Sequence, residues 1–271
     1  MRRDMKHIVD CHCHVYPDKI AVKASENTGK FYGIPMNYDG KVDTVKQLCA
    51  ESGVTHCVVF SVATKPAQTR SINEFIAAAV NENKDMFTGL GTLHPDSEDI
   101  KGDLDHLLSL GLKGVKLHAD IQGFKSDDYR CLKIYELCEK AGIPVLLHAG
   151  DNRYDQSNPN RLKPILDIYT DLTVIAAHLG GYTVWEEACN TLSGYEKLYV
   201  DCSSSLFALA PETARDLIRK YGADKVMFGT DYPMWSPAEE LQRLYALGLN
   251  EDELEMILWK NANRIFDLGL E

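Results

Sequence analysis

The chain has 271 residues and a formal net charge of −11, from 29 Lys and Arg against 40 Asp and Glu. This balance argues against nucleic acid or an anionic membrane surface as the main partner, because both attract basic proteins. No apolar run approaches the ~20 residues of a membrane-spanning helix, and the start lacks the apolar stretch and cleavage site of a signal peptide. We therefore expect a cytoplasmic protein whose eight cysteines are reduced thiols rather than a disulfide framework.

Apolar, β-branched runs alternate with helical segments along the whole chain. The runs predicted as strands lie at residues 7–14, 54–62, 86–93, 112–118, 143–149, 172–178, 198–203 and 225–230. Segments with helical spacing lie between them, and one of these ends at Gly142, a residue type that commonly caps a helix. Apolar strands joined by helices indicate a parallel sheet that helices cover on both faces.

Eight such units favour a closed (β/α)8 TIM barrel of the α/β class. The alternative, an open doubly wound sheet, would place a glycine-rich phosphate-binding turn after the first strand. The chain has His-Cys-His-Val-Tyr-Pro there, at residues 12–17, so the barrel is preferred. We see no repeat, low-complexity segment or linker, and we expect one domain over residues 1–271.

Two segments lie outside the regular alternation. Residues 15–41 are predicted as a long loop, which is usually functional in a compact domain, such as a lid or a substrate wall. Its large side chains are Tyr16, Phe31, Tyr32, Met36 and Tyr38. Residues 252–268 are predicted as an extra C-terminal helix or two, packed against the outside of the barrel. The apolar face of this tail carries Leu254, Ile257 and Leu258.

Imidazole and carboxylate groups stand at the C-terminal ends of four predicted strands. They are His12 and His14 in the first strand, His148 and His178 at the ends of the fifth and sixth, and Asp231 after the eighth. Residues two apart in a strand share a face, so the two histidines of the first strand point the same way. Nitrogen and oxygen ligands of this kind suit a divalent transition metal, and barrel active sites lie at this end. The pattern predicts a metalloenzyme.

The fourth predicted strand carries two further polar residues, Lys116 and His118, on one face. A lysine that points into a barrel is costly unless it is paired or modified. It could become a carbamate that bridges two metals, form an ion pair with an inner carboxylate, or hold an anionic substrate. The residues alone leave these three possibilities open.

Other candidate ligands are assigned by position. Strand parity places Cys11 and Cys13 on the face opposite the metal-binding histidines, towards the helices, where packing is the better interpretation. His94, at the end of the third strand, is either a substrate contact or a spectator. The remaining histidines are expected away from the site: His7, His56 and His106.

Six motifs in this order resemble those of the amidohydrolase superfamily, most closely its amidohydrolase-related branch, which includes aminocarboxymuconate-semialdehyde decarboxylase and related carboxy-lyases. They are D-C-H-C-H at 10–14, G-V-K-L-H at 114–118, P-V-L-L-H at 144–148, H-L-G-G at 178–181, G-T-D-Y-P at 229–233 and I-L-W-K-N-A-N-R-I-F at 257–266. They span nearly the whole chain. The carboxy-lyases of this branch are longer, so the chain is a compact member with its own pocket walls.

The resemblance implies roles for the strand-end residues. It implies that His12, His14 and His148 bind a divalent metal, usually zinc, although manganese or another transition metal also fits, with Asp231 as a further ligand. His178 would be a catalytic or supporting histidine in a mononuclear member and a second-metal ligand in a binuclear one. Binuclear members usually carry a carbamylated lysine or a glutamate on the fourth strand. Lys116 lies two residues inward of His118, so one metal is preferred.

We expect metal-assisted hydrolysis of a small ester, lactone or amide. Asp231 would act as the proton acceptor, and His178 would orient or polarise the substrate carbonyl. Arg153, in the loop after the fifth strand, is either a clamp for a substrate carboxylate or a solvated loop residue. Non-oxidative decarboxylation of a small carboxylic acid is the alternative reaction, and a barrel that binds metal without turnover is the third hypothesis. If the chain self-associates, a homodimer is the expected form, because dimers are the commonest symmetric oligomers.

Overall fold

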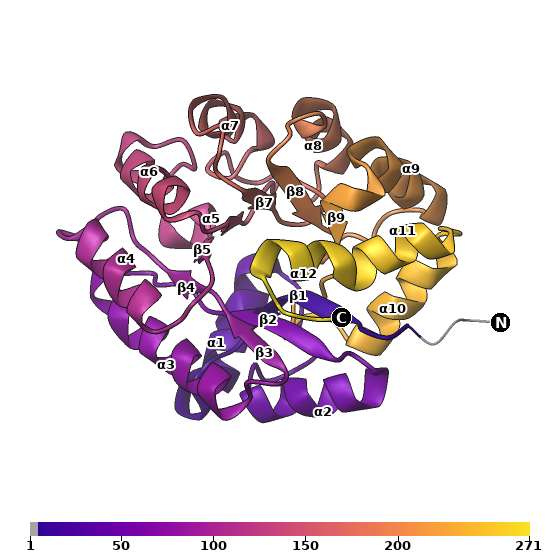
Figure 1. Cartoon of the computed structure of the whole chain (residues 1–271), viewed down its shortest axis with the longest axis horizontal. Helices are drawn as coiled ribbons and strands as arrows, with labels where there is room; N and C mark the ends of the chain where they lie inside the picture. Colours follow the sequence, from indigo (N-terminus) through magenta and orange to yellow (C-terminus); the bar gives the residue numbers. More distant parts are fainter. Residues whose placement is uncertain (1–4) are drawn as a thin grey trace.

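The computed structural model describes residues 5–271, and its strands form a barrel inside a ring of helices (Figure 1). All strand pairs within these residues are parallel. The strands are β1 (Val9–His14), β2 (His56–Phe60), β3 (Phe87–Gly89), β4 (Gly91–Thr92), β5 (Val115–Leu117), β6 (Val145–Leu147), β7 (Val174–Ala176), β8 (Leu198–Asp201) and β9 (Val226–Met227). Each falls inside one of the eight predicted runs, so the strand predictions are confirmed.

Two seams join the three-stranded sheet β1–β3 to the six-stranded sheet β4–β9. At the first, the run 86–93 changes neighbours: Leu90 N donates to Val59 O on one side, and Gly91 N donates to Gly114 O on the other. This run is therefore split into β3 and β4. At the second seam, Cys11 N donates to Phe228 O over 2.9 Å, which ties the last strand to the first. The fold is the predicted α/β class with a (β/α)8 arrangement.

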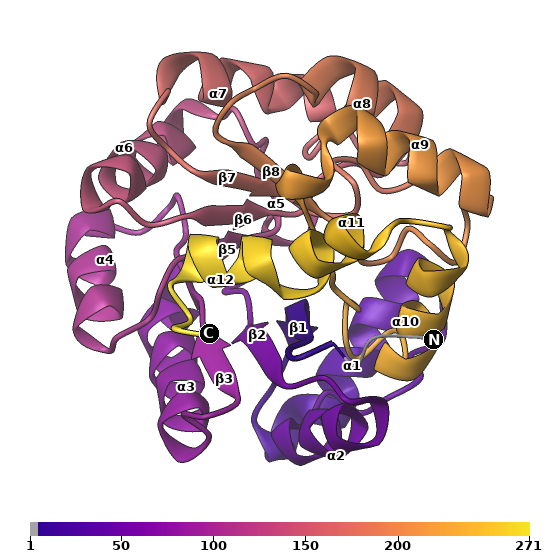
Figure 2. The ribbon, with the colours of Figure 1, turned by 45° about the vertical axis from the view of Figure 1, so that its right-hand side comes forward.

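Eight helices of the described chain form the outer ring, as Figures 1 and 2 show. They are α2 (Val42–Ser52), α3 (Thr69–Glu82), α4 (Ile100–Ser109), α6 (Leu132–Ala141), α7 (Lys163–Ile168), α8 (Trp185–Leu192), α9 (Pro211–Tyr221) and α10 (Pro237–Ala246). The cap predicted for α6 is confirmed, because Gly142 has the left-handed φ of 67° that a glycine adopts without strain. Among residues 5–271, no helix has the length and apolar character needed to cross a bilayer.

The expectation of a loop over residues 15–41 was wrong, because most of this segment is the helix α1 (Asp18–Tyr32). Pro17 precedes its first turn, and Gly33 ends it with φ of 69°. The buried face of α1 carries only the small residues Ala21, Ser25 and Gly29, so the sequence lacks the large apolar stripe that indicates a helix. The expected contribution to a substrate wall is nevertheless present, because one face of α1 lines the main cavity.

Strand parity also failed for Cys11, because β1 contains a bulge. Asp10 pairs with Cys57, whereas Cys13 pairs with Val59, so β1 has one residue more than β2 between these pairs. Cys11 therefore packs inside the barrel, beside Phe60, while Cys13 faces the helices as expected. All eight cysteines are buried free thiols, so the expectation of no disulfide framework holds in this structure.

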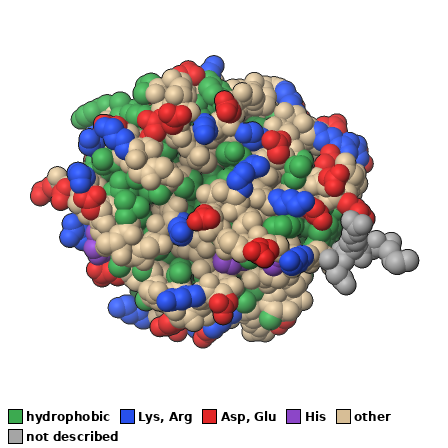
Figure 3. Space-filling model, viewed as in Figure 1, with side chains coloured by type: hydrophobic (Ala, Val, Ile, Leu, Met, Phe, Trp, Pro, Cys, Tyr) green, Lys and Arg blue, Asp and Glu red, His purple; other side chains and the backbone are tan. Residues whose placement is uncertain are grey.

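The tail closes the N-terminal end of the barrel rather than packing on its outside. It comprises α11 (Glu251–Glu255), a π-helical segment (Met256–Lys260) and α12 (Asn261–Phe266), and α12 crosses the barrel end in Figure 2. Ala262 and Phe266 join the interior cluster, whose other members are Val9, Cys11, Val58, Phe60, Leu90, Leu146, Ile175, Ala177 and Met227. The opposite end of the barrel is thus the one that remains open for a site. On the face drawn in Figure 3, acidic and basic side chains are interspersed.

The closing role of the tail can be tested at Phe266, which is 1% exposed. Replacing Phe266 with Ala should lower the free energy of unfolding by about 3–5 kcal/mol, the usual cost of removing a buried aromatic ring. Ile168→Ala, at a position that is 59% exposed, should change it by less than about 1 kcal/mol. Urea denaturation monitored by circular dichroism measures both values. Equal effects of the two substitutions would contradict this role of α12.

Candidate metal centre

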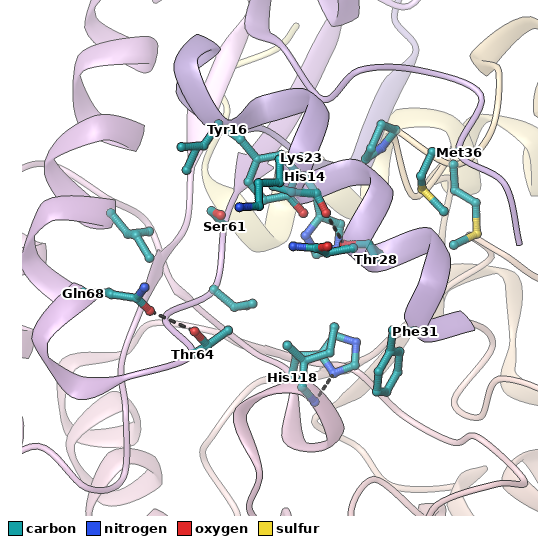
Figure 4. A pocket seen from close by; sticks show the side chains of 18 of the residues that line it. His14, Tyr16, Lys23, Thr28, Phe31, Met36, Ser61, Thr64, Gln68 and His118 are labelled. Atoms are coloured by element: carbon teal, nitrogen blue, oxygen red, sulfur yellow. Dashed lines mark hydrogen bonds between the residues drawn. The ribbon is translucent and has the colours of Figure 1, made fainter. Parts of the chain in front are cut away.

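A cavity of about 750 Å³ opens at the C-terminal ends of the strands. His14, His148, His178 and Asp231 line it, and His12 lies beneath its floor with 1% exposure. The structure therefore brings all five strand-end residues to one end of the barrel, as the sequence predicted. Figure 4 shows the cavity from close by, with His14 and His118 at different sides of it.

The tightest group of ligand atoms joins the first strand to the end of the last. Asp231 Oδ1 lies 3.3 Å from Nε2 of His12 and 3.4 Å from Nε2 of His14. One atom from each of these three residues falls within 4.8 Å of the other two. Two imidazoles and a carboxylate that converge in this way match the ligand preference of a divalent transition metal.

Asp201 orients the His12 ring from behind. Its Oδ2 lies 2.9 Å from His12 Nδ1, and both groups are almost completely buried. An ionised carboxylate can only accept, so His12 carries its proton on Nδ1 and presents a bare lone pair on Nε2. That lone pair and the Asp231 carboxylate are both electron-pair donors that a metal ion would share, although Lys116 Nζ also lies 3.3 Å from His12 Nε2. The residues present therefore fit a metal ion.

A similar constraint fixes the tautomer of His178. Its Nδ1 lies 3.1 Å from the carbonyl oxygen of Ser203, which can only accept, so the ring proton sits on Nδ1. The Ser203 hydroxyl donates to Asp201 Oδ1 and thereby joins the two networks. His178 consequently presents a bare Nε2, 3.0 Å from His148 Nδ1. Asp201, although it lies close to both His12 and His178, accepts hydrogen bonds from this network and is better assigned as their support than as a ligand.

A second group lies on the other side of His148. His118 stacks on His148 with a centroid separation of 3.9 Å, and its Nε2 lies 2.7 Å from the hydroxyl of Tyr32. Asp120 Oδ2 lies 3.5 Å from His148 Nε2 and accepts from Ser157 over 2.5 Å. Within the described chain, His148 Nε2 is buried and has no hydrogen-bond partner. Burial raises the pKa of Asp120 to about 6, although the hydrogen bond from Ser157 lowers it.

Lys116 is fully buried beneath the cavity, with its Nζ 3.3 Å from His12 Nε2 and 5.1 Å from the centre of the Phe60 ring. Burial lowers its pKa to about 8, while the charges of Asp201 and Asp231 favour the ammonium form. Asp201 and Asp231 thus act on Lys116 through their charge, without a direct ion pair among the described residues. His118 lies nearer the open end, as predicted.

Burial and neighbouring charges set the ionisation of the centre. Burial raises the pKa of Asp231, but His12, His14 and His178 together hold it well below its usual range. Burial and the charge of Lys116 lower the pKa of His12 to about 4, despite the opposing effect of Asp201 and Asp231. The centre at neutral pH therefore combines an ionised carboxylate with a neutral imidazole, which is the protonation state that metal binding requires.

Arg153 and His94, the two residues considered as substrate contacts, do not line the cavity. Arg153 donates to both oxygens of Asp151 and to the carbonyl of Phe31, and its guanidinium lies 5.1 Å from the Tyr154 ring centre. His94 does not line the cavity, and its Nδ1 accepts from Asp96 N. The three histidines expected elsewhere contact groups away from the cavity: His7 bonds Glu271, His56 bonds Thr88 and His106 pairs with Glu74.

Sequence reasoning missed Asp201 and Asp120. The run L-Y-V-D at 198–201 ends in a carboxylate at a strand end, which is the same signal that identified Asp231. Asp120 follows His118 by two residues, but it lies on the short helix α5 (Ala119–Gln122), where strand parity does not apply.

A family model described as amidohydrolase matches residues 9–268. The chain belongs to this amidohydrolase family. The family and the ligand groups described above support a divalent metal at this end of the barrel.

Individual relatives carry different activities in their names. The chain is 34% identical over 97 residues to a 2-amino-3-carboxymuconate-6-semialdehyde decarboxylase of Dictyostelium discoideum, and this match covers 34% of the chain and 27% of the relative. An uncharacterized TIM-barrel protein of Bordetella bronchiseptica superposes with a TM-score of 0.81 at 22% identity, covering 97% of this chain and 99% of that one. A putative 2-pyrone-4,6-dicarboxylic acid hydrolase of Pseudomonas putida gives 0.70 at 21% identity, covering 98% and 99%. At these identities the two structures show the fold.

The support that Asp201 gives to His12 can be measured through metal affinity. Replacing Asp201 with Asn should weaken zinc binding by about 10- to 100-fold, the usual effect of losing such a carboxylate behind a histidine ligand. Competition with a chromophoric chelator measures the affinity. Asp43→Asn, at a side chain that is 91% exposed, should leave it unchanged. An affinity of the Asp201 variant within twofold of the unaltered protein would show that the contact has no such role.

Proposed function

We propose that this protein is a metal-dependent hydrolase that acts on a small ester, lactone or amide. The observation that carries the proposal is the ionised carboxylate of Asp231 at the convergence of His12 and His14. Its Oδ1 faces their Nε2 atoms at 3.3 and 3.4 Å, while its Oδ2 accepts from the Ser204 hydroxyl over 2.6 Å. A carboxylate at this position is placed to accept a proton from the attacking water.

His12, His14 and Asp231 would hold the metal, and we propose His148, which follows β6, as the remaining ligand. Zinc is the proposed ion, because two or three neutral imidazoles and one carboxylate form a common zinc ligand set. A metal held there would polarise a substrate carbonyl and lower the pKa of water towards ~7.

In this proposal Asp231 accepts the proton of the attacking water and then returns it to the leaving group. The Ser204 hydroxyl, which donates to Asp231, itself accepts a hydrogen bond from Trp235 Nε1 over 2.9 Å. Trp235 therefore holds this hydroxyl in place. His178 is the proposed second catalytic residue. It lines the cavity, where it would orient the substrate carbonyl.

We propose one metal rather than two. A second ion would use the bare Nε2 of His178 and His148 Nδ1, which face each other at 3.0 Å. It would also need an anionic bridge from the fourth βα unit, and Lys116 would supply one only as a carbamate. As an ammonium facing Asp201 and Asp231, Lys116 instead adds positive charge beside the first site. His118 is proposed as a substrate contact, since it lines the cavity and Tyr32 holds its Nε2.

Decarboxylation of a small carboxylic acid is the second candidate. The name of the Dictyostelium discoideum relative favours it, although that match spans 27% of the relative. The same ligands would then hold the substrate while a protonated group supplies a proton to the carbon that loses CO₂. The ionised state of Asp231 favours hydrolysis, because a proton donor must first be protonated.

The two reactions can be separated by their products. The metal-loaded protein would be incubated with panels of esters, lactones, amides and aromatic or conjugated carboxylic acids. We expect hydrolysis products without CO₂. Release of CO₂ without hydrolysis would overturn the leading proposal in favour of the second. Metal binding without turnover on any panel would instead support a barrel that only binds metal.

Asp231 supplies the matching mutational test. Asp231→Asn should reduce kcat by about 10²- to 10⁴-fold, because an amide cannot accept the proton. The unfolding transition measured by circular dichroism should remain cooperative, and Asp43→Asn serves as the exposed control. Retained turnover in the Asp231 variant would refute its assignment as the base.

Plasma mass spectrometry of the unaltered protein should give about one metal per chain. A value of about two would support a bridging Lys116, and none would contradict the proposed centre.

A further inference from the structure

One wall of the cavity is a largely exposed face of α1, distinct from the face with its buried residues Ala21, Ser25 and Gly29. The face that lines the cavity carries Lys19, Ile20, Lys23, Ala24, Asn27, Thr28 and Phe31, at the spacing that places residues on one side of a helix. Two of these residues, Lys19 and Lys23, are cationic and four positions apart. In Figure 4, Lys23 extends from α1 into the cavity on the side of Tyr16 and Ser61.

The two lysines have no partner in the folded chain. Within residues 5–271 neither forms an ion pair, a side-chain hydrogen bond or an aromatic contact. Two like charges at this spacing repel each other on a helix surface. Lys19 also lies in the first turn of α1, where the helix dipole disfavours a cation. Interactions within α1 therefore do not stabilise these two positive charges. The protein as a whole is acidic, with a net charge of −11.

The rest of the cavity divides into regions of different chemistry. The floor carries the candidate ligands and Asp231. The walls between floor and rim are largely apolar and aromatic, with Phe31, Met36, Ile72, Phe75, Ile121 and Met234. The uncharged polar side chains of Ser61, Thr64, Gln68 and Ser71 also line the cavity. The lysine pair supplies the only Lys or Arg side chains that line this cavity in the described chain.

We propose that Lys19 and Lys23 bind an anionic group of the substrate that is remote from its reacting carbonyl. The substrate class is then a small carbonyl compound with an apolar or aromatic body and a carboxylate at its far end. The inference rests on the proposed function for the reacting end, which the metal centre would hold. Two lysines bind a carboxylate as point charges, so they favour a negative group without demanding one fixed geometry.

Matched hydroxamates test the two ends of the cavity separately. Benzohydroxamate carries a metal-binding group and no carboxylate. The 3-carboxy and 4-carboxy derivatives add a carboxylate at two different distances from the hydroxamate. Calorimetric titration of the zinc-loaded protein would compare their affinities. We expect at least one carboxylated compound to bind three- to tenfold more tightly than benzohydroxamate at low ionic strength. That advantage should shrink in 0.5 M salt, because salt screens exposed charges.

The lysine pair is then tested by substitution. Lys19→Gln/Lys23→Gln should remove the advantage of the carboxylated compound and leave the affinity for benzohydroxamate unchanged. The matched control is Lys30→Gln, in the last turn of the same helix and outside this cavity. An advantage that survives the double substitution, or falls equally in the Lys30 variant, overturns the proposal. If benzohydroxamate itself does not bind the zinc-loaded protein, the proposed metal centre fails, and the inference built on it falls with it.

Discussion

The hydrogen bond between His12 Nδ1 and Asp201 Oδ2 is the interaction on which the site depends. It joins β1 to the end of β8, past the intervening strand β9, at 2.9 Å between two almost fully buried groups. By fixing the proton on Nδ1, it turns the His12 lone pair towards Asp231. The same Asp201 carboxylate accepts from Ser203, which in turn accepts from His178. One buried carboxylate thus organises two of the five strand-end residues.

Parallel barrels explain why much of this site could be predicted from sequence. All strand ends of one polarity meet at one mouth, so imidazoles that follow apolar runs must lie near one another even when they are over a hundred residues apart. This argument located His12, His14, His148, His178 and Asp231 without coordinates. It could not determine which nitrogen of each ring faces the cavity, because that depends on acceptors such as Asp201 and the Ser203 carbonyl on other strands.

The failures have equally specific causes. Parity assumes an unbroken pleat, and the bulge in β1 turns Cys11 into the barrel. Helix α1 escaped recognition because its buried face carries only the small residues Ala21, Ser25 and Gly29. Lys19 and Lys23 lie on a different face, which borders the cavity and for which we propose a role in binding an anionic group. The tail was expected outside the barrel because the apolar stripe of residues 252–268 does not reveal which surface it covers.

A crystal structure of the zinc-loaded protein, with anomalous scattering data collected at the zinc edge, tests the central claim most directly. We predict an anomalous peak about 2.0–2.2 Å from Nε2 of His12, Nε2 of His14 and a carboxylate oxygen of Asp231. A zinc ion bound only by other residues, or no ordered zinc at saturating concentration, would contradict the account.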